Sequence, residues 1–248
     1  MEINNAVILA GGRGDRLRPL TDKIPKPLAP INGVAFLDYL IYSIYQVGIT
    51  NILLLLGYKA DVIVARYNNI QNITIECAHG TEEDKTGSRI LNAYDQLNDH
   101  FLLLYGDNYW PIELDDMRFN YQQPNAAVTT TVFSNKKGTG EYGFRNNVVV
   151  GNDGFVVKYD KKQETDAANG VDMGYFLIAK EALDPEMSGN VSFEEDILPK
   201  LIVKKQLGAY VTDTQYHYIT NMDTLKSFET AVKENSFVPL PRNYFIKS

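Results

Sequence analysis

Short apolar runs alternate with helical patterns through the first half of the chain, and this alternation constrains the fold more than any other feature. Four runs have the length and composition of strands buried on both faces: Ala6–Leu9, Ile52–Leu56, Ile73–Cys77 and Phe101–Tyr105. Apolar side chains recur every three or four residues from Phe36 to Val47, as on a helix, and Gly48 follows as a C-cap. Shorter helical patterns cover Val62–Tyr67 and Ile90–Leu97. Together these predict an α/β fold with a Rossmann-like, mostly parallel mixed sheet flanked by helices.

The second half is less regular, but it contains the same kinds of element. The runs Asn147–Val150 and Phe155–Tyr159 flank the turn sequence Gly-Asn-Asp-Gly and predict a hairpin. Further strands are expected at Ala126–Phe133, Val171–Ile178 and Leu207–Val211, and helices at Phe193–Lys204 and Thr224–Val232. Ser192, with Glu195 three residues on, forms the pattern of a capping box. Because no linker or repeat interrupts the chain, we expect one domain over residues 1–248.

Composition narrows the classes of function. The formal net charge is −7, which argues against a nucleic-acid partner, since such proteins usually present a basic face. No run of about 18 apolar residues is present, so no membrane span is expected, and the first residues lack the basic region of a signal peptide. The single cysteine, Cys77, excludes an intrachain disulfide and a cysteine-based zinc site, and we expect it to be a buried strand residue. A cytoplasmic location fits these features.

A basic island follows the first strand of this acidic chain. It consists of Arg13, Arg16, Arg18, Lys23 and Lys26, and it begins in the turn Gly11-Gly12-Arg13-Gly14. Glycines let backbone N–H groups approach a phosphate chain closely, arginine offers planar two-pronged contacts, and lysine supplies a compact charge. Prolines on either side of Lys26 stiffen the segment that holds its ammonium group. The pattern therefore predicts a phosphate-binding turn.

Two common phosphate motifs do not match this turn. The dinucleotide fingerprint requires a third glycine where Leu17 stands, and the P-loop requires a Gly-Lys-Ser/Thr triplet, which is not present.

The segment from Leu9 to Thr21, with Pro25-Lys26-Pro27, resembles the signature of the sugar-1-phosphate nucleotidyltransferases, with Asp15 in the usual threonine position. The resemblance covers nearly the whole chain and is nearest to short members such as the heptose 1-phosphate guanylyltransferases. It implies the nucleotide-diphospho-sugar transferase fold, with a nucleotide-binding half at about residues 1–125 and a sugar-binding half at about 126–235.

The resemblance also implies roles for the residues of the turn. Arg16 and Lys26 would be catalytic, stabilising charge on the phosphates during transfer. The residues that would bind the nucleotide are Leu9, Gly11, Gly12, Arg13, Gly14 and, further along the chain, Gly87. Many members carry a base-reading Leu-Gly-Thr-Gly/Ala-Gly-Ala stretch where this chain has Lys85–Arg89, so the identity of the base stays open.

Asp107 follows the fourth apolar strand in a Gly-Asp pair that matches the metal-binding aspartate of the family. Ligands collect at the carboxyl ends of strands in open α/β sheets, and a carboxylate suits the hard cation Mg²⁺. The resemblance therefore implies that Asp107 binds Mg²⁺ and contacts the substrate, with Asp223 as second metal ligand. A second alignment would place Tyr218 at that position and leave the second ligand missing.

Four residues match the sugar side of the family: Tyr142, Gly143, Lys162 and Asp172. Asp172 stands in an Asp-Met-Gly segment where many members have Asn-x-Gly, which adds a charge to the sugar site. Tyr109 and Trp110 could line a sugar pocket, although an aromatic core is the favoured interpretation. The three histidines show no ligand spacing and no nucleophile partner, so we expect none to be catalytic.

The sequence thus predicts that a nucleoside triphosphate and a sugar 1-phosphate react, with Mg²⁺, to give a nucleotide sugar and pyrophosphate. Guanylyl transfer to a heptose or hexose 1-phosphate is the favoured version. Three alternatives stay open: cytidylyl transfer to a sugar or non-sugar phosphate, a nucleotide-sugar-dependent glycosyltransferase, and a non-catalytic regulatory relative. A glycosyltransferase usually shows Asp-x-Asp, and Gly106-Asp107-Asn108 offers one acid. The segment Pro239–Phe245 leaves a homo-oligomer open.

Overall fold

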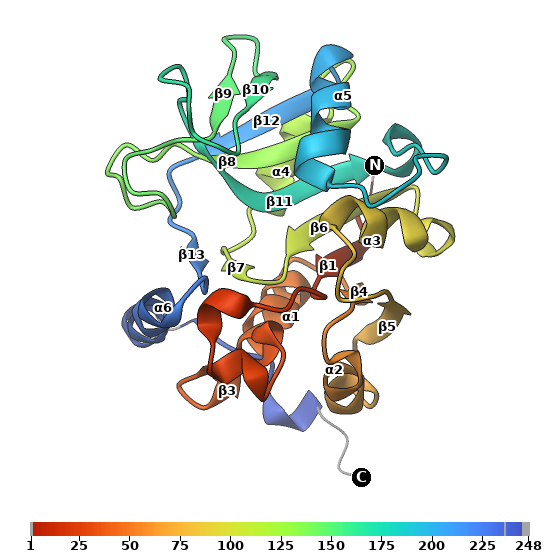
Figure 1. Cartoon of the computed structure of the whole chain (residues 1–248), viewed down its shortest axis with the longest axis vertical. Coiled ribbons are helices and arrows are strands. Elements are labelled where there is room, and N and C mark those ends of the chain that lie inside the picture. Colours follow the sequence, from red (N-terminus) through yellow and green to blue (C-terminus); the bar gives the residue numbers. More distant parts are fainter. Residues whose placement is uncertain (1, 236, 245–248) are drawn as a thin grey trace. The chain divides into compact units, whose positions relative to one another are not determined.

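The computed structural model describes residues 2–235 and 237–244, and it is organised around a seven-stranded mixed sheet (Figure 1). The strand order is β12-β8-β11-β6-β1-β4-β5. These strands are β1 (Asn5–Leu9), β4 (Asn51–Leu56), β5 (Thr74–His79), β6 (His100–Tyr105), β8 (Val128–Phe133), β11 (Val171–Ala179) and β12 (Leu207–Thr212). The predicted fold class, a mostly parallel mixed sheet flanked by helices, is confirmed.

The other elements are helices and short paired strands. The α-helices are α1 (Phe36–Gln46), α2 (Ala60–Tyr67), α3 (Thr86–Asn92), α4 (Leu114–Tyr121), α5 (Leu198–Val203) and α6 (Met222–Asn235). The short strands pair as β2 (Pro30–Ile31) with β3 (Val34–Ala35), β9 (Val148–Val150) with β10 (Val156–Tyr159), and β7 (Asn108–Tyr109) with β13 (His217–Tyr218). Three single 3₁₀ turns follow β1: η1 (Asp15–Leu17), η2 (Leu20–Asp22) and η3 (Lys26–Leu28).

The chain folds into two compact units that interleave along the sequence. Unit 1 takes the described residues of Met1–Glu83, Leu104–Ile112 and His217–Ser248, and unit 2 consists of Asp84–Leu103 and Glu113–Tyr216. The last helix thus returns to the unit in which the chain begins. A single functional domain with halves at about 1–125 and 126–235 stays a prediction, because compactness does not define function.

Unit 1 is built on parallel strands. β1 pairs with β4 and β4 with β5. β1 and β4 are almost entirely apolar, whereas β5 also carries polar residues. Helix α1 ends at Gln46, and Gly48 terminates it just beyond, as predicted, with a φ of 85° that is readily adopted only by glycine. Helix α6 packs Phe228 against the rings of Phe36 and Tyr39, so the C-terminal helix covers an N-terminal one (Figure 1).

Unit 2 mixes strand directions. β8 pairs in parallel with β12 and antiparallel with β11, and all six of its residues are buried. The predicted hairpin is present as β9 and β10, closed by a hydrogen bond from Gly151 N–H to the Phe155 carbonyl. The β8–β11 pairing is interrupted between Asp172 and Phe176, a local irregularity of the kind that bulges produce beside functional sites.

Several sequence expectations need correction. Ser192 caps the helical segment and accepts from Glu195 N–H as predicted, but Asp196 rather than Glu195 returns the bond to Ser192 N–H. A π-helical turn, η6 (Phe193–Ile197), begins the segment, and this changes which acid can reach back. Cys77 is half-buried rather than buried, because β5 is the last strand of its sheet.

Two elements had no clear sequence signal. The sequence of α4 has a weak pattern in which only Leu114, Met117 and Tyr121 are buried. The pairing of β7 with β13 joins two-residue strands more than 100 positions apart, which no local periodicity reports. Tyr109 and Trp110 belong to the buried core, as favoured from the sequence.

The C-terminal segment packs on its own chain as far as it is described. The Tyr244 ring meets the Tyr45 ring edge-on at 5.5 Å between centroids, and the Tyr244 carbonyl accepts from Gln71 N–H. Phe245 lies outside the described residues, and a homo-oligomer stays a prediction. Across residues 2–235 and 237–244, every helix falls short of the length and apolar character that a membrane span requires.

Candidate functional site

The glycine-rich turn of unit 1 leaves the carboxyl end of β1 and is anchored on the neighbouring strand. Ala10 N–H donates to the Leu55 carbonyl at 3.0 Å, and Tyr58 N–H donates to the Gly11 carbonyl at 2.9 Å. A Cβ at Gly12 would meet no atom within 4 Å, so the space over this glycine is open. An exposed glycine beside anchored backbone gives a phosphate a close approach.

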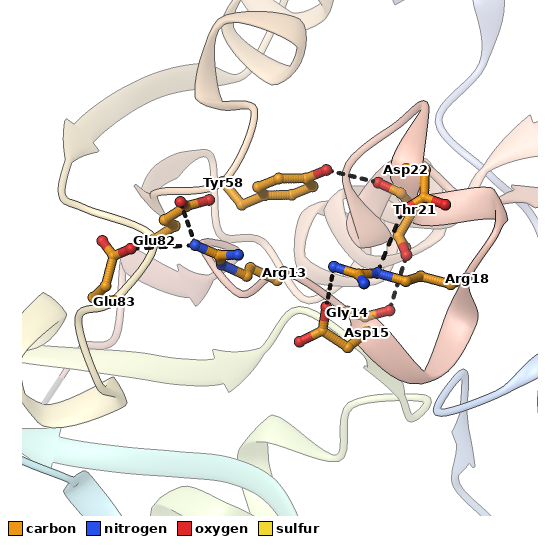
Figure 2. Close-up of polar contacts among 9 residues, drawn as sticks. All are labelled: Arg13, Gly14, Asp15, Arg18, Thr21, Asp22, Tyr58, Glu82 and Glu83. Carbon is orange, nitrogen blue, oxygen red and sulfur yellow. Dashed lines mark hydrogen bonds and ion pairs between the residues drawn. The ribbon is translucent and has the colours of Figure 1, made fainter.

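Gly14 has a different reason to be glycine. Its φ is 69°, and a Cβ at this position would lie 2.9 Å from Lys26 Cβ. The Thr21 hydroxyl donates to the Gly14 carbonyl, and the Tyr58 hydroxyl donates to the Thr21 carbonyl (Figure 2). Gly14 thus lets the stiff Pro-Lys-Pro segment pack against the turn, which brings Lys26 and the turn together.

Lys26 forms an ion pair with Asp107. The Lys26 Nζ to Asp107 Oδ2 distance is 2.6 Å, and the side chains are 12% and 31% exposed. Lys26 comes from η3 and Asp107 from the end of β6, so the pair joins positions 81 apart in sequence. A partly buried cation and anion that meet just beyond the end of β6 suit a site that handles charged phosphates.

Gly106 explains how Asp107 reaches this position. Gly106 N–H donates to the Leu9 carbonyl at 2.9 Å, and a Cβ on Gly106 would lie 2.6 Å from that oxygen. Only glycine allows such close backbone approach. In the Gly-Asp pair, Gly106 is therefore required for packing, while Asp107 is the residue expected to act chemically.

The other basic residues of the island differ in their partners. Arg13 Nη2 contacts the carboxylates of Glu82 and Glu83, which follow β5 (Figure 2). Arg18 pairs with Asp15 at 2.8 Å and Asp22 at 3.3 Å. Arg16 is exposed and forms no ion pair within the described part of the chain. The arginine predicted to be catalytic is therefore available to an incoming anion.

The second metal ligand predicted from the sequence, Asp223, lies in the first turn of α6. The Asn221 side chain caps this helix by accepting from Asp223 N–H and Thr224 N–H, each at 3.0 Å. Tyr218 pairs with Asn108 in the β7–β13 ladder, and Ile219 N–H donates to the Asp107 carbonyl at 3.0 Å. The backbone next to Tyr218 thus lies beside Asp107, as the second alignment would require. The ligand role of Asp223 stays a prediction.

The donors around Asp107 suit a metal that is completed by substrate. Within the described residues, no group of three or more His, Cys, Asp or Glu side chains could hold a metal ion. Mg²⁺ is usually held by one or two carboxylates, with phosphates and water completing its shell. The half-exposed Asp107 carboxylate, engaged through Oδ2 by Lys26, fits that arrangement.

Asp172 is the most perturbed of the residues predicted for the sugar side, all of which lie in unit 2. Its carboxylate is buried and accepts from the Thr130 hydroxyl at 2.8 Å, the Tyr159 hydroxyl at 3.0 Å and Gly174 N–H at 3.1 Å. Burial raises the pKa of Asp172 to about 6, although these three donors oppose the shift. Sequence reasoning missed Thr130 and Tyr159, because their positions give no sign that they meet Asp172.

Tyr142 and Gly143 lie in a loop that Asn135 braces. Asn135 Nδ2 donates to the Gly143 carbonyl at 2.8 Å, and its Oδ1 accepts from Gly140 N–H at 2.9 Å. Gly143 has a φ of 63°, which favours glycine. Tyr142 is 37% exposed on this loop.

The remaining predicted residues, Gly87 and Lys162, have simpler surroundings. Gly87 is buried in α3, and a Cβ there would lie 2.8 Å from the Val191 carbonyl, so packing alone requires glycine. Lys162 is exposed in the turn after β10. The roles of both stay predictions.

The histidines offer no evident general base. Burial lowers the pKa of His217 to about 4, and its ring packs between Phe228 and Phe237. His100 Nδ1 lies 3.0 Å from the Tyr121 hydroxyl, and His79 is exposed on β5.

A Rossmann-like sheet with a glycine-rich turn, a basic island and an Asp–Lys pair at its strand ends defines a class of nucleotide-handling transferases. Comparison with known proteins agrees. The Nucleotidyl transferase family profile matches residues 5–231, and the chain belongs to this family.

Two relatives are similar to this chain over most of their length. A probable glucose-1-phosphate cytidylyltransferase of Bacillus subtilis is 30% identical over 90% of this chain and 92% of its own. The D-glycero-alpha-D-manno-heptose 1-phosphate guanylyltransferase of Aneurinibacillus thermoaerophilus is 28% identical, over 85% and 90%. The predicted family and enzyme class are confirmed.

Solved structures share the fold. HddC of Yersinia pseudotuberculosis, complexed with GMP-PN, superposes with a TM-score of 0.77 at 24% identity, over 92% of this chain and 99% of that chain. A putative glucose-1-phosphate thymidylyltransferase of Bacillus anthracis gives 0.82 at 15% identity, over 97% and 98%.

Proposed function

We propose that this protein transfers a guanylyl group from GTP to a heptose or hexose 1-phosphate, forming a nucleotide sugar and pyrophosphate. The observation that carries the transfer chemistry is the Lys26–Asp107 pair beside the open glycine-rich turn of unit 1. The guanylyl assignment is supported by the heptose 1-phosphate guanylyltransferase relative.

In the proposed reaction, an oxygen of the sugar phosphate attacks the α-phosphorus of the nucleotide. The bond from the α-phosphorus to the bridging oxygen breaks, and pyrophosphate leaves with both electrons. The second pKa of a phosphate ester is about 6, so the nucleophile is already largely ionised near neutral pH and needs no general base. This agrees with the three histidines, of which one is half-buried with a lowered pKa, one contacts a tyrosine hydroxyl and one is exposed on a strand.

The residues of the chain then act by position and charge. The glycine-rich turn receives the triphosphate, and Arg16 and Lys26 compensate the charge on the phosphates. Asp107, with Asp223 as the second candidate, would hold Mg²⁺. When bound, Mg²⁺ would supply charge compensation to the departing pyrophosphate. Lys26 keeps the Asp107 carboxylate in place through its 2.6 Å contact.

On the acceptor side, we propose that Tyr142, Gly143, Lys162 and Asp172 of unit 2 bind the sugar phosphate. A lysine contributes charge to the phosphate, and a hydrogen-bonded carboxyl group recognises hydroxyls. Gly87 is proposed to contact the base.

The second candidate is cytidylyl transfer to glucose 1-phosphate. It is favoured by the relative from Bacillus subtilis, which is 30% identical over nine-tenths of the chain.

The test is pyrophosphate release with Mg²⁺, using ATP, GTP, CTP, UTP and dTTP against a panel of hexose and heptose 1-phosphates. We expect release only when GTP and one sugar 1-phosphate are both present. Release with CTP and glucose 1-phosphate would select the second candidate, whereas no release with any pair would refute the transferase assignment.

A further inference from the structure

Arg13 of the glycine-rich turn is held by two carboxylates from another loop of unit 1. Glu82 and Glu83 lie just after β5, where Gly80 N–H donates to the Leu56 carbonyl at 3.0 Å. Because β1, β4 and β5 are parallel, their carboxyl ends lie at one edge, which brings this acidic loop to the turn (Figure 2). The Arg13 to Glu83 distance is 3.2 Å.

Both contacts use the same nitrogen of Arg13, Nη2. A guanidinium offers two edges for a two-pronged contact: the side edge between Nε and Nη2, and the end between Nη1 and Nη2. Each of these edges includes Nη2. A phosphate that binds Arg13 through two hydrogen bonds must therefore displace at least one of the two carboxylates from this nitrogen.

The charges around Arg13 also oppose an incoming polyanion. Two carboxylates face one guanidinium, so the formal charge of the cluster is −1, from one positive and two negative groups. All three side chains are at least 35% exposed, so the ion pairs are weak enough for a charged ligand to exchange with them. Arg18, by contrast, is held by acids of its own segment.

We propose that Glu82 and Glu83 compete with the nucleotide triphosphate for Arg13, and that this competition sets the affinity of the protein for its nucleotide. The inference rests on the proposed function, because it takes the glycine-rich turn as the triphosphate site. Only the fraction of molecules in which Arg13 is released binds the phosphates fully, so the acids lower the apparent affinity. Removing their charge strengthens nucleotide binding.

The experiment is calorimetric titration of the full-length chain with Mg²⁺ and either GTP, CTP or inorganic tripolyphosphate. Loss of two exposed ion pairs of this kind changes an equilibrium constant by about three- to tenfold. We expect Glu82→Gln/Glu83→Gln to bind GTP and tripolyphosphate more tightly by this factor. Tripolyphosphate separates an effect on the phosphates from one on the base.

The matched control is Asp15→Asn/Asp22→Asn, which removes two carboxylates from Arg18 in the same turn region. This control changes net charge equally, and we expect it to shift affinity by less than about twofold. In an Arg13→Ala background, the gain from the Glu82→Gln/Glu83→Gln pair should vanish, since the acids act through Arg13.

Weaker or unchanged binding by the glutamine pair overturns the inference. An equal gain in the control, or in the Arg13→Ala background, does so as well. If wild type binds GTP but releases no pyrophosphate with any sugar phosphate, the proposed reaction fails. The affinities of the variants still decide in that case whether the two acids compete for Arg13. If no variant binds either GTP, CTP or tripolyphosphate, both proposals fail.

Discussion

The residues proposed for the site carry their charges differently in the two units. In unit 1, the charged groups of the candidate site lie in turns and loops between the strands and pair with one another, as Lys26 does with Asp107 and Arg13 with Glu82 and Glu83. In unit 2, Asp172 is buried within a strand, 8% exposed, and its partners are hydroxyl and N–H groups. The pairs of Arg13 are exposed and exchange readily with charged ligands, whereas a buried hydrogen-bonded carboxyl is fixed in geometry.

The contrast suits the two proposed ligands. A triphosphate carries several negative charges. It binds by contacting cationic side chains, which must be accessible to it. A sugar is recognised through the directions of its hydroxyl groups, which requires donors and acceptors that do not move. The predictions below test this division, from the largest expected effect to the smallest.

Loss of charge in unit 1 should affect the chemical step most. We expect Lys26→Ala or Asp107→Ala to lower kcat by about 10²- to 10³-fold, the scale for one preorganised charge contact. Steady-state pyrophosphate release measures this effect. Lys23→Ala, in the same basic island but outside the proposed site, is the control and should stay within about twofold. Turnover at the wild-type rate in Asp107→Ala would refute its assignment as the metal ligand.

Neutralising Asp172 should instead change how stability depends on pH. Its folded pKa of about 6 lies above the unfolded value, so the folded state binds the proton more tightly. The contribution of Asp172 to the free energy of unfolding is therefore complete below about pH 4. It is lost as pH rises through about 6, by up to about 3 kcal/mol. In Asp172→Asn this loss disappears, because an amide does not titrate in this range. The Tyr159 hydroxyl can turn to accept from the new amide N–H, which keeps the contact.

The measurement is the difference in unfolding free energy between Asp172→Asn and wild type, from urea titrations across this pH range. We expect the difference to favour the variant increasingly above about pH 4 and to level off above about pH 6. A difference that does not vary with pH would show that Asp172 titrates normally, and would remove the contrast between the units.

His217, in unit 1, is a half-buried group whose pKa is shifted in the direction that favours the neutral side chain. Its folded pKa of about 4 lies below the unfolded value, so the stability it contributes is present above about pH 6.5 and is lost as pH falls toward about 4. Between about pH 7.5 and pH 5, the free energy of unfolding of wild type should fall by about 2 kcal/mol, whereas that of His217→Phe should not show this fall. Urea unfolding midpoints at each pH measure the difference. His79→Asn, an exposed histidine on β5, should follow wild type, and matching slopes for all three chains would contradict the prediction.

A substitution at Gly12 should affect nucleotide binding without affecting the stability of unit 1. Nothing lies within 4 Å of a Cβ placed there, so Gly12→Ala should keep the stability of wild type within about 0.5 kcal/mol. The methyl group would occupy the space left for a phosphate and raise the KM for the nucleotide by about tenfold, the loss of one hydrogen bond to a charged group.

The control is Gly106→Ala, whose Cβ would lie 2.6 Å from the Leu9 carbonyl. We expect it to lower the melting temperature, which Gly12→Ala does not. If both variants melted alike and bound nucleotide alike, the glycine-rich turn would be structural only.

Much of the fold was readable because each element carries its own local pattern. The apolar runs of β1, β4 and β6, the Gly48 cap and the β9–β10 turn are all short-range signals. The phosphate-binding turn was readable for the same reason, since its glycines and basic residues are contiguous. Its chemistry needs them close together, and a turn places neighbours in sequence close together in space.

The tertiary structure alone decided which distant groups meet. No local pattern indicates that Lys26 pairs with Asp107, that Glu82 and Glu83 reach Arg13, or that Thr130 and Tyr159 donate to Asp172. The same holds for the antiparallel β11 beside the parallel pair β8 and β12. Periodicity reports which face of an element is buried, but partners and electrostatic environment depend on long-range pairing, and that is fixed only when the whole chain packs.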